Sequence, residues 1–289
     1  MSALFSSVLG NSQKLDGGAM FGNAPRAVWS KWMEPDAEGR IDLACRTLLI
    51  EIGNRKILCE TGIGNFFPPK LKERFGVEGN RNQLLVNLNT LGVQENEITD
   101  VILSHLHFDH AGGLLSDYQE DKAHELHFPK AHYYVGKTAW ERARNPHSRD
   151  QASFIPELIE LLKKSNRLHV IESSQCELLP KEFTFRYSNG HTPGQMHTVY
   201  QGKERKLIFC GDLIPGRHWV HLPITMGYDR NPEQLIDEKE ALYQEWVPEG
   251  SFLYFTHDPI YCLSRVQCLD GKYSARDLVK ELKREALDL

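Results

Sequence analysis

One short segment restricts the fold and chemistry of this chain more than any other. Three histidines and one aspartate occur within six residues, in the pattern His105-x-His107-x-Asp109-His110. The short, β-branched, apolar run at 100–104 that precedes them predicts a buried strand. The glycines at 112–113 favour a sharp turn behind it. The histidines are therefore expected on a loop at the end of a core strand, where rigid scaffolds display reactive groups.

This loop predicts part of a metal centre. Imidazole nitrogens and carboxylate oxygens bind zinc-like ions. On an extended segment His105 and His107 point the same way, Asp109 continues the alternation, and His110 turns to the other side. Four donors do not complete two ions, which need about eight. The remaining ligands must come from elsewhere in the chain.

Three further candidates each follow a predicted strand. His191 lies in the turn-rich segment Asn189-Gly190-His191-Thr192-Pro193-Gly194. Asp212 follows the apolar strand at 206–210, and His257 follows the strand at 251–256. Ligands at strand ends are expected along one edge of a sheet.

Composition excludes several classes of protein. The chain has 289 residues, 25% of them charged and 40% hydrophobic, with a net charge of -5, so it offers no electrostatic case for nucleic acid or an anionic membrane. It contains no apolar run of transmembrane length, and its N-terminus is a poor signal peptide. The six cysteines are scattered, which predicts reduced thiols and a cytoplasmic location.

The pattern of elements predicts an α/β fold, with two sheets and helices outside, in a single domain at 1–289 with an irregular N-terminal arm at about 1–45. Other strands are expected at 46–52, 55–60, 131–135, 168–172, 183–188 and 197–201. Helices are expected at 83–92, 137–144, 154–165, 232–246 and 274–286.

With these motifs in order, the chain resembles the metallo-β-lactamase superfamily. The resemblance implies an αββα sandwich over the whole chain, two mixed β-sheets with helices outside. It also implies a dinuclear site with a hydroxide between the metals as nucleophile. His105, His107 and His191 would hold the first metal, and Asp109, His110 and His257 the second, with Asp212 bridging them. The ions would be Zn, with Mn, Fe or Co also compatible with nitrogen and oxygen donors.

One residue departs from the family pattern. Glu60, in Glu60-Thr61-Gly62, occupies a position where the family usually has Asp. The resemblance implies that this carboxylate supports the site without being a ligand. The longer side chain is expected to shift the orientation of a histidine without abolishing metal binding.

A narrower resemblance concerns the substrate. The arm at 15–31, Asp212-Leu213-Ile214-Pro215, Met226-Gly227-Tyr228-Asp229 and Phe255-Thr256-His257-Asp258 are similar to YtnP-type quorum-quenching lactonases. This implies hydrolysis of a small-molecule lactone, with N-acyl-homoserine lactones the leading substrate. The best-known acyl-homoserine lactonases have Tyr where this chain has Pro215, which removes one argument for that substrate.

The predicted roles follow from this reading. Asp109 is the candidate catalytic residue, passing a proton to the leaving alkoxide. Substrate contacts are expected from Met20, Phe21, His218, His221 and Tyr228. The apolar arm suggests a homodimer.

Two alternatives stay open at this point. The first is an aryl ester, phosphotriester or thioester hydrolase of the same fold, because the fold serves many reactions. The second is a non-catalytic metal-binding effector, against which the complete ligand set argues.

Overall fold

Two six-stranded mixed sheets form the framework of the computed structural model, which describes residues 3–289. Each sheet belongs to its own structural unit. Unit 1 comprises the chain up to Gln13, Ala44–Glu172 and Lys283–Leu287. Unit 2 comprises Lys14–Leu43, Ser173–Leu282 and Asp288–Leu289. The predicted fold class, α/β with two mixed sheets and helices, is confirmed.

The sheet of unit 1 has the strand order β1-β4-β5-β6-β7-β8. Its first three strands pair antiparallel and its last three join in parallel. Its strands are β1 (Leu4–Leu9), β4 (Arg46–Ile52), β5 (Arg55–Cys59), β6 (Asp100–Leu103), β7 (His132–Gly136) and β8 (Leu168–Ile171). A further residue, Glu285, forms an isolated bridge with Phe5 beside β1.

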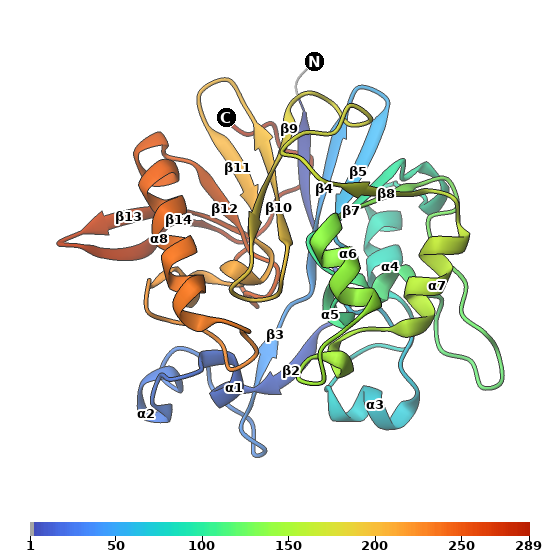
Figure 1. Cartoon of the computed structure of the whole chain (residues 1–289), viewed down its shortest axis with the longest axis horizontal. Helices are drawn as coiled ribbons and strands as arrows, with labels where there is room; N and C mark the ends of the chain where they lie inside the picture. The colour runs from blue at the N-terminus through green and yellow to red at the C-terminus, as the bar shows by residue number, and fades with distance from the viewer. Residues whose placement is uncertain (1–2) are drawn as a thin grey trace. The chain divides into compact units, whose positions relative to one another are not determined.

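Helices α4, α6 and α7 pack against this sheet and build the core of unit 1 (Figure 1). Leu84 of α4, Ala139 of α6 and Leu158 of α7 pack in one cluster with Val101 and Tyr133 of the sheet. Local signals start two of these helices, an Asn82 side-chain cap for α4 and a proline in the first turn for α7. The helices of unit 1 are α3 (Pro69–Arg74), α4 (Gln83–Thr90), α5 (Phe108–Ala111), α6 (Lys137–Arg144) and α7 (Pro156–Lys164), with 3₁₀ helices η1 (Glu95–Glu97), η2 (Gly112–Leu114) and η3 (Gln151–Ser153).

The sheet of unit 2 has the strand order β14-β13-β12-β11-β10-β9. Only β11 and β12 pair in parallel. Its strands are β9 (Phe183–Ser188), β10 (Gln195–Gln201), β11 (Lys206–Phe209), β12 (Phe252–Tyr254), β13 (Leu263–Leu269) and β14 (Lys272–Val279). Two shorter strands, β2 (Gln13–Asp16) and β3 (Arg40–Leu43), form a separate sheet.

The long helix α8 (Pro232–Glu249) and the N-terminal arm contribute to the core of unit 2. Asn231 caps α8 through its side chain, and Gly250 ends it in a left-handed conformation, so the helix is longer than the predicted 232–246. Its Tyr243 and Trp246 pack in one cluster with Ile208 and Leu253 of the sheet. The other helices of unit 2 are α1 (Gly17–Phe21) and α2 (Arg26–Trp29), with 3₁₀ helices η4 (Gly211–Leu213) and η5 (Arg217–Val220).

Two expectations about secondary structure are wrong. The helix predicted at 274–286 is replaced by β14, which pairs with β13 across the two-residue turn Asp270-Gly271, where both residues have positive φ. An Asp-Gly pair is a strong hairpin signal, and it outweighs the helical spacing that follows it. The arm is also not irregular throughout, because Leu4–Leu9 pairs with β4.

Candidate metal centre

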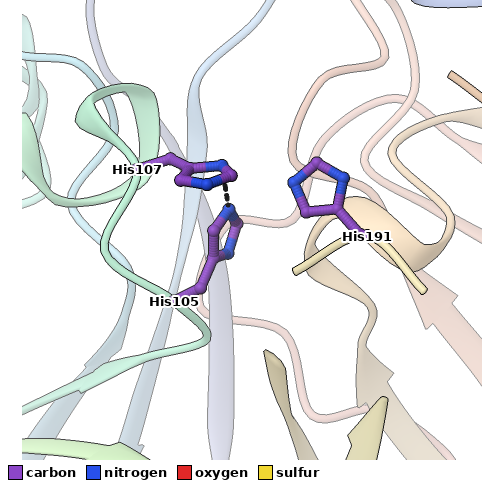
Figure 2. Close-up of side chains that lie close together, drawn as sticks. All are labelled: His105, His107 and His191. Atoms are coloured by element: carbon purple, nitrogen blue, oxygen red, sulfur yellow. Dashed lines mark hydrogen bonds between the residues drawn. The ribbon is translucent and has the colours of Figure 1, made fainter. Parts of the chain in front are cut away.

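The loop that follows β6 brings its histidines together. We call His105, His107, Asp109 and His110 the loop set. Nε2 of His105 lies 3.0 Å from Nδ1 of His107, and the two rings meet edge to face (Figure 2). Both residues are buried, with 1% and 7% of their surface exposed. Asp109 does not continue the extended alternation as predicted, because α5 begins at Phe108 and places Asp109 and His110 in its first turn.

The two glycines behind the loop set provide space for close backbone packing. Gly112 ends α5 with an ordinary helical φ of -63°. A Cβ on Gly112 would lie 2.4 Å from the carbonyl oxygen of Ile63, and one on Gly113 would lie 2.0 Å from that of Thr61. The predicted sharp turn is therefore better described as a close approach of this segment to the chain after β5.

Glu60 fixes two members of this region. Its Oε2 accepts a hydrogen bond from Nδ1 of His110 at 2.8 Å, and its Oε1 accepts one from the Ser104 hydroxyl. Nδ1 of His110 then carries the proton, which leaves Nε2 as the atom with a lone pair. Glu60 has a φ of 63°, an uncommon conformation for a residue with a side chain. This contact agrees with the supporting role that the sequence resemblance implied for Glu60, and that role stays a prediction.

Asp109 is held by a residue that sequence reasoning did not identify. Nε2 of Gln13 donates to Oδ2 of Asp109 at 2.7 Å, and Gln13 is completely buried. The other carboxylate oxygen, Oδ1, lies 3.7 Å from Nε2 of His110. Gln13 belongs to no motif and lies 96 positions from Asp109 in the sequence, so only the tertiary structure identifies it.

Unit 2 holds a second group of candidate ligands, His191, Asp212 and His257, which we call the strand-end set. Each residue follows the end of a strand, β9, β11 or β12, as predicted. Oδ2 of Asp212 lies 3.3 Å from Nε2 of His191, and Oδ1 lies 3.2 Å from Nε2 of His257. Each carboxylate oxygen thus faces one imidazole nitrogen, an arrangement suited to a bridging carboxylate.

Asp229 orients His191 and was also missed as a functional residue. Its Oδ1 lies 2.8 Å from Nδ1 of His191, while its Oδ2 accepts from the Met226 backbone at 2.6 Å. With Nδ1 engaged by this carboxylate, Nε2 of His191 is directed to Asp212. Asp229 lies in Met226-Gly227-Tyr228-Asp229, a segment that carries the resemblance to lactonases, but that resemblance assigned it no role.

His197 supports the strands that carry the strand-end set. It is fully buried, its Nδ1 donates to the Cys210 carbonyl at 3.0 Å, and its Nε2 accepts from the Ser188 hydroxyl at 2.8 Å. Burial lowers the pKa of His197 to about 4, so the ring is neutral at pH 7. His197 thus links Ser188, three residues before His191, to Cys210, two residues before Asp212.

A buried lysine on α8 donates hydrogen bonds to the loop between Asp212 and α8. Nζ of Lys239 donates to the carbonyls of Ile224 at 2.9 Å and His221 at 3.2 Å. Burial lowers the pKa of Lys239 to about 7, and the nearby Asp229 carboxylate opposes that shift. The lysine therefore anchors the loop that ends in Asp229.

The residues predicted to contact substrate have different environments within unit 2. Met20 and Phe21 are buried in its core, where Phe21 stacks on Trp219 at a centroid distance of 4.5 Å. His218 stacks on Trp32 at 5.6 Å and lies edge-on to Phe21 at 6.5 Å, and burial lowers its pKa to about 4. His221 and Tyr228 are exposed. A substrate contact for all five stays a prediction.

The donor chemistry of these residues fits divalent cations. In unit 1, Glu60, His105 and His110 offer atoms that all lie within 4.8 Å of one another, and all three are buried. Buried imidazoles and carboxylates at this density are costly unless they are paired or bind a cation. Neither the loop set nor the strand-end set contains a cysteine, so nitrogen and oxygen are the only donor types.

Comparison with known proteins defines the class. A model of the metallo-beta-lactamase superfamily matches residues 40–257, and the chain belongs to that superfamily. A probable metal-dependent hydrolase from Staphylococcus aureus is similar to this chain, with 25% identity and a TM-score of 0.85, covering 99% of this chain and 98% of its own. These findings confirm the predicted class of metal-dependent hydrolase.

Two more distant structures share the fold. The hydrolase AbOPH of the beta lactamase superfamily is 19% identical with a TM-score of 0.76, and 95% of this chain and 94% of that chain are covered. AidC, a dizinc quorum-quenching lactonase, is 20% identical with a TM-score of 0.72 and the same coverage of 95% and 94%. Within residues 3–289, no helix combines the length and apolar character needed to cross a bilayer.

Proposed function

We propose that this protein opens the ring of small lactones, with N-acyl-homoserine lactones as the leading substrate. The observation that carries the hydrolytic part is the arrangement at Asp212, whose two oxygens each face one imidazole nitrogen. Support for the substrate comes from AidC, which was crystallised with an N-acylated homoserine product, and from an N-acyl homoserine lactone hydrolase with N-hexanoyl-L-homoserine at its metal centre.

We infer that the loop set and the strand-end set serve one pair of cations, with zinc as the leading candidate. In this assignment His105, His107 and His191 would hold one ion, Asp109, His110 and His257 would hold the other, and Asp212 would be shared by both. When bound, such ions would supply Lewis acidity and would lower the pKa of a coordinated water to about 7. Family membership and the orientation of each nitrogen within its own set support this assignment.

The residues of the chain then perform defined tasks. Glu60 and Asp229 hold one ring nitrogen of His110 and His191, so that the other nitrogen is available as a ligand. Ring opening releases an alkoxide that must receive a proton, and Asp109 is the proposed carrier. The Gln13 amide donates to Oδ2 of Asp109 at 2.7 Å and so restrains the orientation of the carboxylate.

The test uses metal-free protein reconstituted separately with zinc, manganese, iron or cobalt. Proton release is followed with N-acyl-homoserine lactones of increasing chain length, beside a panel of aryl esters, phosphotriesters and thioesters. We expect lactone turnover that is lost in His105→Ala and retained in His147→Gln, a matched control because His147 is exposed. Turnover of another ester class without any lactone would overturn the substrate assignment, and metal binding without any turnover would favour a non-catalytic effector.

A further inference from the structure

Two ligand-bearing turns of unit 2 are joined by one backbone carbonyl. The turn after Asp212 contains Pro215, whose carbonyl oxygen accepts from the backbone N–H of His257 at 2.9 Å and from that of Asp258 at 3.1 Å. The position where the best-known acyl-homoserine lactonases have Tyr thus provides, as Pro215, a backbone anchor for the turn that carries His257.

An ion pair reinforces this junction. Asp258 is completely buried, and Nη1 of Arg217 donates to its Oδ1 at 2.7 Å. The backbone N–H of Arg217 donates to the other oxygen, Oδ2, at 3.0 Å. The guanidinium and the backbone N–H of Arg217 therefore each donate to a different oxygen of the Asp258 carboxylate.

Asp258 also organises its own turn. Its Oδ1 accepts the backbone N–H groups of Ile260 at 3.0 Å and Tyr261 at 2.9 Å. The Arg217 guanidinium lies 4.9 Å from the centre of the Tyr261 ring, a cation–π distance. A Cβ on Gly216 would lie 3.3 Å from Cβ of Asp258, so the two turns pack closely.

We propose that the Arg217–Asp258 pair is a positioning device that holds His257 opposite Asp212. Arg217 lies five residues after Asp212 in the chain, and Asp258 directly follows His257, so the pair ties the two ligand-bearing turns together. The nitrogen of His257 and the oxygen of Asp212 then stay 3.2 Å apart. This inference rests on the proposed assignment of Asp212 and His257 as metal ligands. Arg217 and Asp258 are positioning residues, because they act through the turns and not on the substrate.

The test measures metal affinity apart from activity. Arg217→Gln and Arg217→Lys are titrated with zinc against a chromogenic chelator, and metal content is measured after dialysis. We expect Arg217→Gln to weaken one of the two zinc ions by about 10- to 100-fold, with partial rescue in Arg217→Lys. Activity at saturating zinc should show a lower kcat with KM nearly unchanged.

Arg265→Gln is the matched control. Arg265 also pairs with a carboxylate, Asp277 at 2.6 Å, and also lies beside an aromatic ring, Phe252 at 5.7 Å. The Arg265→Gln variant should bind both zinc ions with the affinity of the wild type. If Arg217→Gln does not fold, Asp258→Asn replaces it, because asparagine keeps an acceptor for the turn and removes the charge.

The outcomes separate this inference from the proposed function. Wild-type zinc affinity in Arg217→Gln, or an equal loss in Arg265→Gln, would overturn the positioning role. His257→Ala is measured in parallel and should lose one zinc ion. Retention of both ions in His257→Ala would instead overturn the ligand assignment on which the inference rests.

Discussion

The loop set and the strand-end set offer the same kinds of donor atom, but their members are spaced very differently along the chain. The loop set occupies six consecutive residues, 105–110, after one buried strand. The strand-end set spans 191–257 and depends on three strands being placed correctly in one sheet. The donor atoms of a local set keep their relative positions when the sheet shifts slightly. In a dispersed set, each side chain needs its own restraint. The supporting contacts of Asp229, His197 and Asp258 in unit 2 provide such restraints.

The largest effect that tests this contrast comes from Asp212→Ala. Removing the carboxylate that faces both imidazoles leaves His191 and His257 without their shared partner. We expect kcat/KM to fall at least about 10³-fold, equivalent to about 4 kcal/mol of transition-state stabilisation. Steady-state kinetics with metal analysis checks this. Near-normal activity would show that Asp212 does not bridge the ions.

A smaller effect is expected from the two supporting carboxylates, and it compares the sets directly. Glu60→Gln weakens the grip on His110, and Asp229→Asn weakens that on His191. Each should cost about 10- to 100-fold in metal affinity or activity. If locality matters, Asp229→Asn should cost more than Glu60→Gln, as measured by zinc titration of both variants. The reverse order would show that the loop set depends more on its support.

The smallest effect concerns pH and the stability of unit 2. The folded-state pKa of His197 is about 4 against an ordinary 6.5, so the unfolded chain binds more protons between these values. The contribution of His197 to the free energy of unfolding is therefore fully present above about pH 6.5 and is lost as the pH falls towards 4. From pH 7 to 5.5 the loss from this group is about 1 kcal/mol. Urea unfolding of metal-free wild type and His197→Gln should show this difference, whereas identical pH dependence would exclude it.

The sequence predicts what depends on neighbours along the chain. The buried strand at β6, the Asn-Pro start of α8 and the loop set all follow from local patterns. Gln13, Asp229 and the Arg217–Asp258 pair could not be found this way. In each case the two residues in contact are 38 to 96 positions apart in the sequence, and only the folded structure brings them close. The strand β14 differs from these cases, because the Asp270-Gly271 pair is a local hairpin signal that outweighs the helical spacing at 274–286.

The bridge between Glu285 and Phe5 covers part of the edge of the unit 1 sheet. Strand β1 lies at the edge of its sheet, and exposed edges template pairing with other chains. The Phe5 N–H donates to the Glu285 carbonyl at 2.9 Å, and the Glu285 N–H donates back at 3.0 Å. Arg284 adds a hydrogen bond from its backbone to the Ser6 hydroxyl. A protein lacking residues 283–287 would keep every candidate ligand and yet present an open strand to its neighbours, so loss of solubility would precede loss of catalysis.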